Sequence, residues 1–434
     1  MNKKKFLNIF LNPLFLIVLT GLIFRLIAWY NTCIVNPDAA VYIAQAKALY
    51  NNSYSAILTT RLGYLSIYSL CIALLFPLFS NWIITATLIS IFFGTMTIIP
   101  LYFFLKKYLD RQYALMTTLI MATLPVFVSR SVDIIKDPMY WFFLASGLYF
   151  FVRQLEEKNK KWAIVPFLFF FLATLVRIEA IIILLVSLVF LVFCNKKQKY
   201  IIGFIVLFSV IGISLAGNIE FLKIAFTKFF RFNYVIDLVS NFYRDYQALR
   251  TQVKHLAFQQ PLTMKLFLLD AGRDMWLIGL ENFFNSFLEG VAYIPGLLCI
   301  TGIVSFSMFK MDKKFIYCLG IMFASFFVLY VFNLNTWILP YRYVILFIIP
   351  SSVFMGLGLK KYCLYANQKW NISEIVAMRI LIAIVLIVAM SKDLKPRRAD
   401  QVMKNKSSVY LPIQNKKQIA NNYIKPKKNS INFI

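Results

Sequence analysis

Long apolar runs alternate with short polar or basic segments along almost the whole chain. A helix needs about 20 apolar residues to cross the ~30 Å hydrocarbon core of a bilayer, and runs of about 16 to 24 residues recur here. The pattern predicts an all-α polytopic membrane protein with about 11 transmembrane helices. The candidate spanning segments are 9–30, 83–105, 113–129, 137–152, 162–176, 178–194, 200–216, 288–309, 315–333, 342–359 and 376–391.

Segment 64–79 is short for a span, and Pro77 interrupts its end. If it does not cross, the N-terminus and five later loops share one side and hold 19 Lys and Arg, against six in the opposite short loops. Cytoplasmic loops carry the excess of Lys and Arg in membrane proteins. We therefore expect 64–79 to lie along or dip into the outer surface of the plasma (inner) membrane.

Composition supports a membrane protein. Of the 434 residues, 60% are apolar and 15% are charged, whereas a soluble domain carries about 25% charged residues. The net charge of +28 would suit a nucleic-acid-binding protein, but most Lys and Arg form short clusters between apolar segments, where orientation signals belong. We therefore expect a lipid bilayer and no nucleic acid as partner. The six cysteines form no CxxC pair, and no cofactor is predicted.

The same pattern divides the chain into four parts. Residues 1–216 form a transmembrane module whose first outer loop is 31–82. An aromatic-rich amphipathic block, 217–287, is expected to lie near the outer surface. Residues 288–391 supply the C-terminal transmembrane helices, and 392–434 form a basic polar tail.

Asp38 follows the first apolar run within "NPDAAVYIAQAKALY". Asn36 suits a helix cap, Pro37 suits the first helical position, and an acid in the first turn complements the helix dipole, which is a sufficient structural explanation. The functional alternative is a general base at the membrane boundary. Tyr42 lies one turn further along the same face and is a candidate for binding a sugar or an acceptor.

Asp133 and Asp137 are four residues apart, and Lys136 precedes the second. If this stretch is helical, both carboxylates share one face and would hydrogen-bond sugar or acceptor hydroxyls. With Asp38 they would also suit a divalent ion, but no dense acidic cluster appears and no metal is predicted. Alternatively, Asp137 and a proline after it simply begin the next helix.

The apolar stretch 162–193 would make a helix of roughly 48 Å, far longer than one span. Its polar break is Arg177-Ile178-Glu179. A charge at mid-bilayer costs on the order of 2.5–3.5 kcal/mol, so the break is expected at the outer surface. There Arg177 either pairs with Glu179 or binds the phosphate of a lipid.

Further candidates lie on the same predicted face. Arg342 begins the last but one spanning segment and would join an anion site, as would Arg61 in the first outer loop. Tyr343 is a candidate for binding a sugar or an acceptor. A single cation at such a position is more often an interfacial anchor than a ligand, and their predicted convergence on one face favours a site.

The order of these motifs resembles the GT-C superfamily of membrane glycosyltransferases. The stretches that carry the resemblance are "PDAAVYIAQAKAL", "TLPVFVSRSVDIIKDPMYWFFLASGLYFF", "LATLVRIEAIIILL" and "YRYVILFIIP". The chain looks closest to the branch with the dolichyl-phosphate-mannose–protein mannosyltransferases and the bacterial aminoarabinose transferases. The resemblance covers about residues 9 to 194, with a weaker similarity at 340–350.

The resemblance implies an outer-face enzyme that takes a sugar from a polyprenyl-phosphate donor, inverts its anomeric centre and passes it to a hydroxyl-bearing acceptor, as in protein glycosylation or lipopolysaccharide modification of the cell envelope. Asp38 matches the family's catalytic base, and Arg177 matches the arginine of its "RxE" hairpin. The family often has Asp-Glu where this chain has Asp38-Ala39. Lys136, Arg342 and Arg61 would then help to bind the donor phosphate.

The sequence leaves two other functions open. A ligase or polymerase that moves a preassembled glycan from a polyprenyl diphosphate would depend on arginines of the 217–287 block, such as Arg231, Arg244 and Arg250. A lipid-linked sugar flippase or transporter would not be an enzyme at all. Transporters tend to show repeated halves and charges near mid-membrane, whereas here no halves repeat and the charges lie at predicted helix ends.

Overall fold

The computed structural model describes residues 12–32, 34–53, 64–157, 164–194, 232–305, 311–393 and 411–412. Within these residues the fold is a bundle of helices with one two-residue strand pair. Five helices are long and apolar enough to cross a membrane, or up to seven if each of two bent helix pairs is counted as one span. The chain is therefore a multi-pass helical membrane protein, as predicted, while the expected number of about 11 spans is not confirmed.

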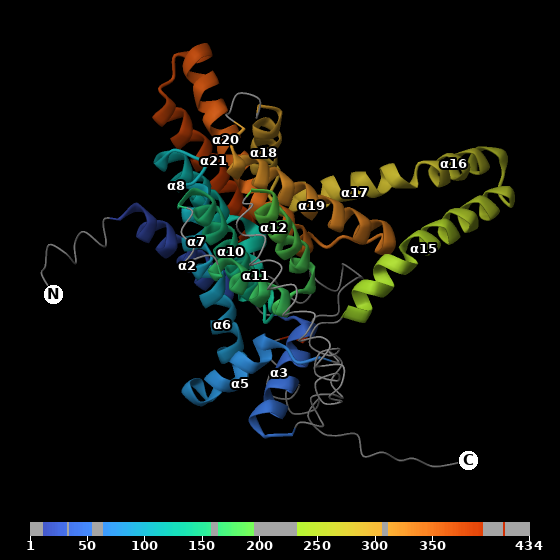
Figure 1. Ribbon diagram of the computed structural model, residues 1–434, viewed down its shortest axis with the longest axis horizontal. Helices are drawn as coiled ribbons and strands as arrows, with labels where there is room; N and C mark the ends of the chain where they lie inside the picture. The colour runs from blue at the N-terminus through green and yellow to red at the C-terminus, as the bar shows by residue number, and fades with distance from the viewer. Residues whose placement is uncertain are drawn as a thin grey trace, which may run out of the picture.

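The helices before the middle block occupy most of the predicted positions. Figure 1 shows them as the blue and green part of the bundle. They are α2 (Pro13–Tyr30), α3 (Pro37–Tyr50), α5 (Ile67–Phe79), α6 (Trp82–Met96), α7 (Ile98–Leu105), α8 (Arg111–Thr123), α9 (Pro125–Val132), α10 (Asp137–Glu157), α11 (Val165–Val176) and α12 (Ile181–Cys194), with the 3-10 turn η2 (Ile178–Ala180) before α12.

Helices α3 and α5 lie together beyond one end of the bundle (Figure 1). At 1.5 Å per residue, the 13 residues of α5 extend only about 20 Å, less than a bilayer core. The ring of Tyr42 on α3 packs edge-on against Tyr68 of α5, with centroids 5.3 Å apart. The hydroxyl of Tyr68 also donates a hydrogen bond to Ala86 O on α6. These contacts hold the first loop against the bundle end.

A buried arginine stabilises the bend between α8 and α9. The two helices meet at 48° at Leu124, whose extended backbone ends α8. Arg25 on α2 is 1% exposed and donates to Ala122 O in the last turn of α8 and to Ser131 Oγ on α9. A guanidinium is well suited to the carbonyls at a helix C-terminus. The contact fixes how α9 leads toward the turn before α10.

The remaining helices include a hairpin that projects sideways from the bundle, α15 with α16 (Figure 1). The predicted amphipathic helix is thus present in the described part of the block, while residues 217–231 lie outside it. These later helices are α15 (Phe232–Phe258), α16 (Leu262–Arg273), α17 (Met275–Gly290), α18 (Ile294–Val304), α19 (Lys313–Thr336), α20 (Tyr341–Trp370) and α21 (Glu374–Asp393).

Two predicted boundaries in this region are wrong. The expected span 288–309 is broken, because α17 and α18 meet at 119°. Ala292 and Tyr293 have φ angles of 59° and 60°, a left-handed backbone that ends a helix. The expected loop 360–369 is instead the end of the 30-residue α20. Its lysines mark the end of a helix rather than a connection.

Glycines allow α18 and α20 to pack backbone to backbone. A Cβ on Gly302 would lie 1.8 Å from Phe354 O, and one on Gly358 would lie 1.9 Å from Leu298 O. Small residues at such positions let membrane helices approach closely. This contact sets α20 firmly in the bundle core, and α20 carries two predicted site residues in its first turn.

The strand pair joins β1 (Ile34–Val35), just before α3, to β2 (Leu411–Pro412) in antiparallel register. The rest of the predicted tail after Asp393 lies outside the described residues.

Candidate active site

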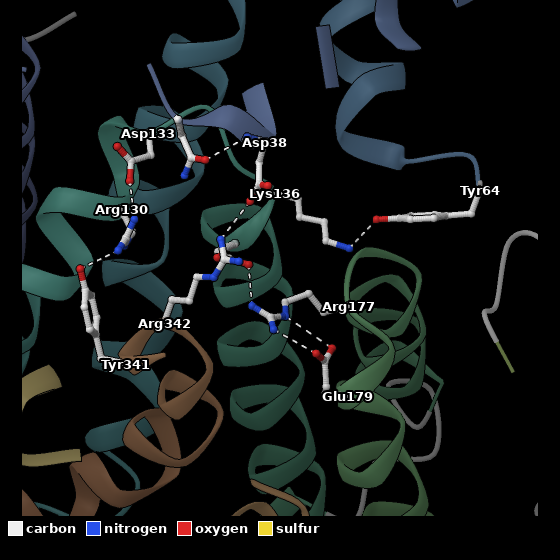
Figure 2. Close-up of polar contacts among 11 residues, drawn as sticks. Asp38, Tyr64, Arg130, Asp133, Lys136, Arg177, Glu179, Tyr341 and Arg342 are labelled. Carbon is white, nitrogen blue, oxygen red and sulfur yellow. Dashed lines mark hydrogen bonds and ion pairs between the residues drawn. The ribbon is translucent and has the colours of Figure 1, made fainter. Parts of the chain in front are cut away.

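A cavity of about 410 Å³ opens at one end of the bundle. Its walls come from α3, the turn before α10, the break between α11 and α12, and the first turn of α20. Figure 2 shows the polar side chains of these four segments pointing toward one another. Eight predicted site residues line the cavity: Asp38, Tyr42, Lys136, Asp137, Arg177, Glu179, Arg342 and Tyr343.

Asp38 lies at the mouth of the cavity with its side chain 47% exposed. Asn36 Oδ1 accepts a hydrogen bond from Asp38 N at 2.9 Å and Pro37 opens α3, so the predicted cap is present. The carboxylate also accepts a hydrogen bond from Arg342 Nη1 at 3.0 Å. The capping and the site geometry therefore coexist, because the cap fixes the backbone while the carboxylate turns to the cavity.

Arg177 forms the buried centre of the site. Its guanidinium donates to Asp137 Oδ1 at 2.7 Å and to Glu179 Oε1 at 3.0 Å. Burial by itself lowers the pKa of Arg177, but the carboxylates of Glu179 and Asp137 outweigh burial and hold it above its ordinary value. The cation therefore stays charged. Asp137 begins α10, where a negative charge also meets the positive end of the helix dipole.

Lys136, in the turn before α10, also lines the cavity. Its Nζ lies 2.9 Å from the hydroxyl of Tyr64 and 5.1 Å from the centre of that ring. In the described part of the chain, no carboxylate forms an ion pair with Lys136. Glu179 is close enough to feel the charge of Lys136, and an anion in the cavity would also be attracted to this lysine.

Sequence reasoning missed Tyr64 and the residue that holds it. Gln45, on the second turn of α3 beyond Asp38, is fully buried and donates to Tyr64 O at 2.6 Å. Its Oε1 accepts from Ser66 N at 2.9 Å. The sequence did offer a signal: Gln45 stands among apolar and small residues on α3. A glutamine buried in such a helix needs polar partners, here the backbone on either side of Tyr64.

Tyr42 and Tyr343 give the cavity its aromatic surface. Burial is the main cause that raises the pKa of Tyr42 well above its ordinary value, and Tyr64 and nearby carboxylates add to it. Its hydroxyl therefore keeps its proton and can donate a hydrogen bond. The ring of Tyr343 contacts the guanidinium groups of Arg177 and Arg342.

One described residue of the predicted site, Asp133, does not line this cavity. Asp133 follows the end of α9 in an extended conformation, so it does not share a helix face with Asp137 as a continuous helix would require. It pairs instead with Arg130 at 2.9 Å, and the same arginine bonds the hydroxyl of Tyr341 beside the site (Figure 2). The last residue of the predicted site, Arg61, lies outside the described residues, so its prediction is not tested.

Chemically, the cavity combines three cations with three carboxylates, of which Asp38 is exposed, Glu179 is partly buried and Asp137 is buried. The exposed carboxylate is suited to accept a proton, and the cations are suited to hold an anion. Among the residues described, no group of three or more His, Cys, Asp or Glu side chains is arranged to hold a metal ion.

Comparison with known proteins supports the resemblance read from the sequence. Residues 66–216 match the family described as dolichyl-phosphate-mannose-protein mannosyltransferase. No curated protein matches the chain. The matched segment contains the walls of the cavity from Lys136 to Glu179.

Solved structures share the fold. The Archaeoglobus fulgidus oligosaccharyltransferase, tethered to an acceptor peptide, aligns with a TM-score of 0.54 and 13% identity over 96% of this chain and 60% of its own. ArnT from Cupriavidus metallidurans bound to undecaprenyl phosphate aligns with a TM-score of 0.52 and 11% identity over 88% of this chain and 75% of its own. The chain thus spans about 60% of the length of the oligosaccharyltransferase. The resemblance to GT-C membrane glycosyltransferases is confirmed.

Proposed function

We propose that the protein is an inverting glycosyltransferase that moves a sugar from a polyprenyl-phosphate donor to a hydroxyl group of a lipid, glycan or protein. The observation that carries this proposal is one cavity lined by Asp38, Lys136, Arg177 and Arg342. The family match, the shared fold and the undecaprenyl phosphate bound to ArnT all support it.

The donor phosphate would occupy the cationic part of the cavity. Lys136, Arg342 and Arg177 come from three separate segments and would donate hydrogen bonds to its oxygens. As the bond from the sugar to the phosphate breaks, negative charge grows on the leaving group. Fixed cations lower the barrier most when they contact charge that develops in the transition state.

Asp38 would accept the proton of the acceptor hydroxyl. The hydroxyl oxygen then attacks the anomeric carbon from the side opposite the phosphate, the new glycosidic bond forms, and the phosphate leaves with the bonding electrons. Arg342 now contacts the carboxylate, and the donor phosphate would draw this arginine toward itself. Tyr42, Asp137 and Glu179 would orient sugar or acceptor hydroxyls.

The site would face the non-cytoplasmic side of the cell membrane. The charge count places the segments of Asp38, Lys136, Arg177 and Arg342 opposite the lysine-rich loops. The expected count of about eleven spans includes 200–216, which lies outside the described residues, and 288–309, which is broken at the bend between α17 and α18.

Arginines of the middle block give less support to a diphosphate-dependent ligase. Arg244 is 73% exposed on α15 and pairs with its neighbour Asp245, and neither it nor Arg250 lines the cavity. Arg231 lies outside the described residues.

The test is transfer of labelled sugar from a polyprenyl-phosphate donor in membranes containing the full chain. A positioned general base contributes about 10²- to 10⁴-fold, so Asp38→Asn should lower turnover by at least about 100-fold. Asp110→Asn is the matched control, because Asp110 is an exposed acid paired with Lys360 far from the cavity. Near-normal turnover by Asp38→Asn would refute the role of Asp38.

A further inference from the structure

The ring of Tyr343 contacts both arginines of the cavity. The guanidinium carbon of Arg177 lies 4.3 Å from the ring centroid, and that of Arg342 lies 5.4 Å from the same point. Both lie within the ~6 Å at which a cation is attracted to an aromatic face. One ring therefore joins cations from the end of α11 and the first turn of α20.

The ring itself is held from a third helix. Phe332 on α19 packs against Tyr343 with ring centroids 5.2 Å apart. The backbone is also fixed, because Tyr343 N donates to Pro340 O at 2.9 Å in the first turn of α20. A ring that is anchored in this way has little freedom to turn toward a ligand, and it can act as a fixed spacer.

A spacer is needed because two like charges in one small cavity repel each other. Carboxylates hold each arginine separately, Asp137 and Glu179 for Arg177 and Asp38 for Arg342. The shared ring attracts both cations. Because both distances end at one centroid, the guanidinium carbons lie at most roughly 10 Å apart, so a phosphate bound between the two arginines would be near both.

We propose that Tyr343 is a positioning residue whose ring face, rather than its hydroxyl, sets the spacing of Arg177 and Arg342 for one lipid phosphate. The inference rests on the proposed polyprenyl-phosphate donor. It replaces the sequence-based prediction that Tyr343 binds a sugar or an acceptor, a role in which the hydroxyl would donate or accept the decisive hydrogen bond.

Direct binding tests the inference without any need for an acceptor. Undecaprenyl phosphate, which carries no sugar, is titrated onto the full chain in nanodiscs. Tyr343→Leu removes the ring and should weaken binding about tenfold, whereas Tyr343→Phe keeps the ring and should bind within about twofold of the wild type. Tyr365→Leu is the control for the substitution itself, because it lies at the far end of α20, is half exposed and should bind normally.

Thermal unfolding identifies any variant that has lost its fold, and Tyr343→Met replaces Tyr343→Leu if that variant unfolds. If Tyr343→Leu binds undecaprenyl phosphate with normal affinity, the inference about Tyr343 is overturned, while the proposed donor is not affected. A Tyr343→Phe variant as weak as Tyr343→Leu would also overturn the inference, because the hydroxyl would then be the group that matters. A wild-type protein that does not bind undecaprenyl phosphate would overturn the proposed donor, and the inference with it.

Discussion

Helices α10 and α20 each carry two sets of charged residues, one at the cavity and one further along the helix, and the two sets differ in their surroundings. At one end, Asp137 and Arg342 line the cavity. At 1.5 Å per residue, Glu156 lies roughly 28 Å further along α10 and Lys360 roughly 27 Å further along α20, ten residues before that helix ends. Both form ion pairs, and we call this level of the bundle the far end. Both separations are close to the thickness of a bilayer core, so each set would lie near a membrane surface.

The cavity end holds one buried ion pair, Arg177 with Asp137, whereas the ion pairs of the far end are all partly exposed. The side chains of Arg177 and Asp137 are 7% and 5% exposed, whereas those of Lys360 and Asp110 are 33% and 67% exposed. Lys107 and Lys314 both pair with Glu156 and tie together three helix ends. Ion pairs alone therefore do not identify a site; burial around a cavity does.

Breaking the buried pair should have the largest effect. Arg177→Gln leaves the carboxylate of Asp137 buried without its cation, which typically costs about 3–5 kcal/mol of unfolding free energy. Loss of a cation that stabilises the leaving group should also lower activity by about 100-fold or more. Thermal unfolding in detergent and donor turnover measure the two effects separately.

The double variant Arg177→Gln with Asp137→Asn separates folding from function. Removing both charges should restore much of the stability, because no uncompensated buried charge from this pair is left. Activity should stay low. A double variant that recovers full turnover would mean that this pair serves only the fold.

Replacing a lysine should have a smaller effect than breaking the buried pair, and the effect should differ between the cavity end and the far end. Lys136→Gln should raise the donor KM about tenfold, since a hydrogen bond to a charged group contributes roughly 1.5–3 kcal/mol. Lys314→Gln, the matched change at the far end, should leave the donor KM unchanged. Equal donor KM values in the two variants would contradict the division between the ends.

The smallest effect concerns pH at the far end. Partial burial by itself raises the pKa of Glu156, but hydrogen bonds from Lys107 and Lys314 outweigh burial and place it below its ordinary value. The stabilisation by Glu156 is therefore present above the pKa of the unfolded chain, about 4.3, and is lost as the pH falls below that value.

In the variant Glu156→Gln this stabilisation is absent at every pH. At pH 7 we expect it to be less stable than the wild type by at most about 1 kcal/mol, because the pair is partly exposed. The difference should shrink as the pH falls below about 4. A gap in thermal unfolding temperature that widens toward acid pH would show that the carboxylate acts in the opposite sense.

Several site residues were predictable because each stands at a polar break in an apolar pattern. Asp38 has a helix cap before it, and Arg177 and Glu179 interrupt a stretch too long for one span. Tyr64 and Gln45 were missed, because a tyrosine and a glutamine near apolar segments have no pattern of their own. The proposed shared helix face for Asp133 and Asp137 failed, because the backbone leaves the helical conformation between them.

The sequence by itself determined that the chain is a multi-pass helical membrane protein, since apolar length and the placement of charges act locally on each segment. It also indicated most of the helix ends that line the cavity. Only the tertiary structure decided which charges meet. Arg342 contacts Asp38 across 304 residues of chain, and such a contact depends on the packing of α20 against the whole bundle. Partners at that separation are chosen by the geometry of many helices together, which no local pattern records.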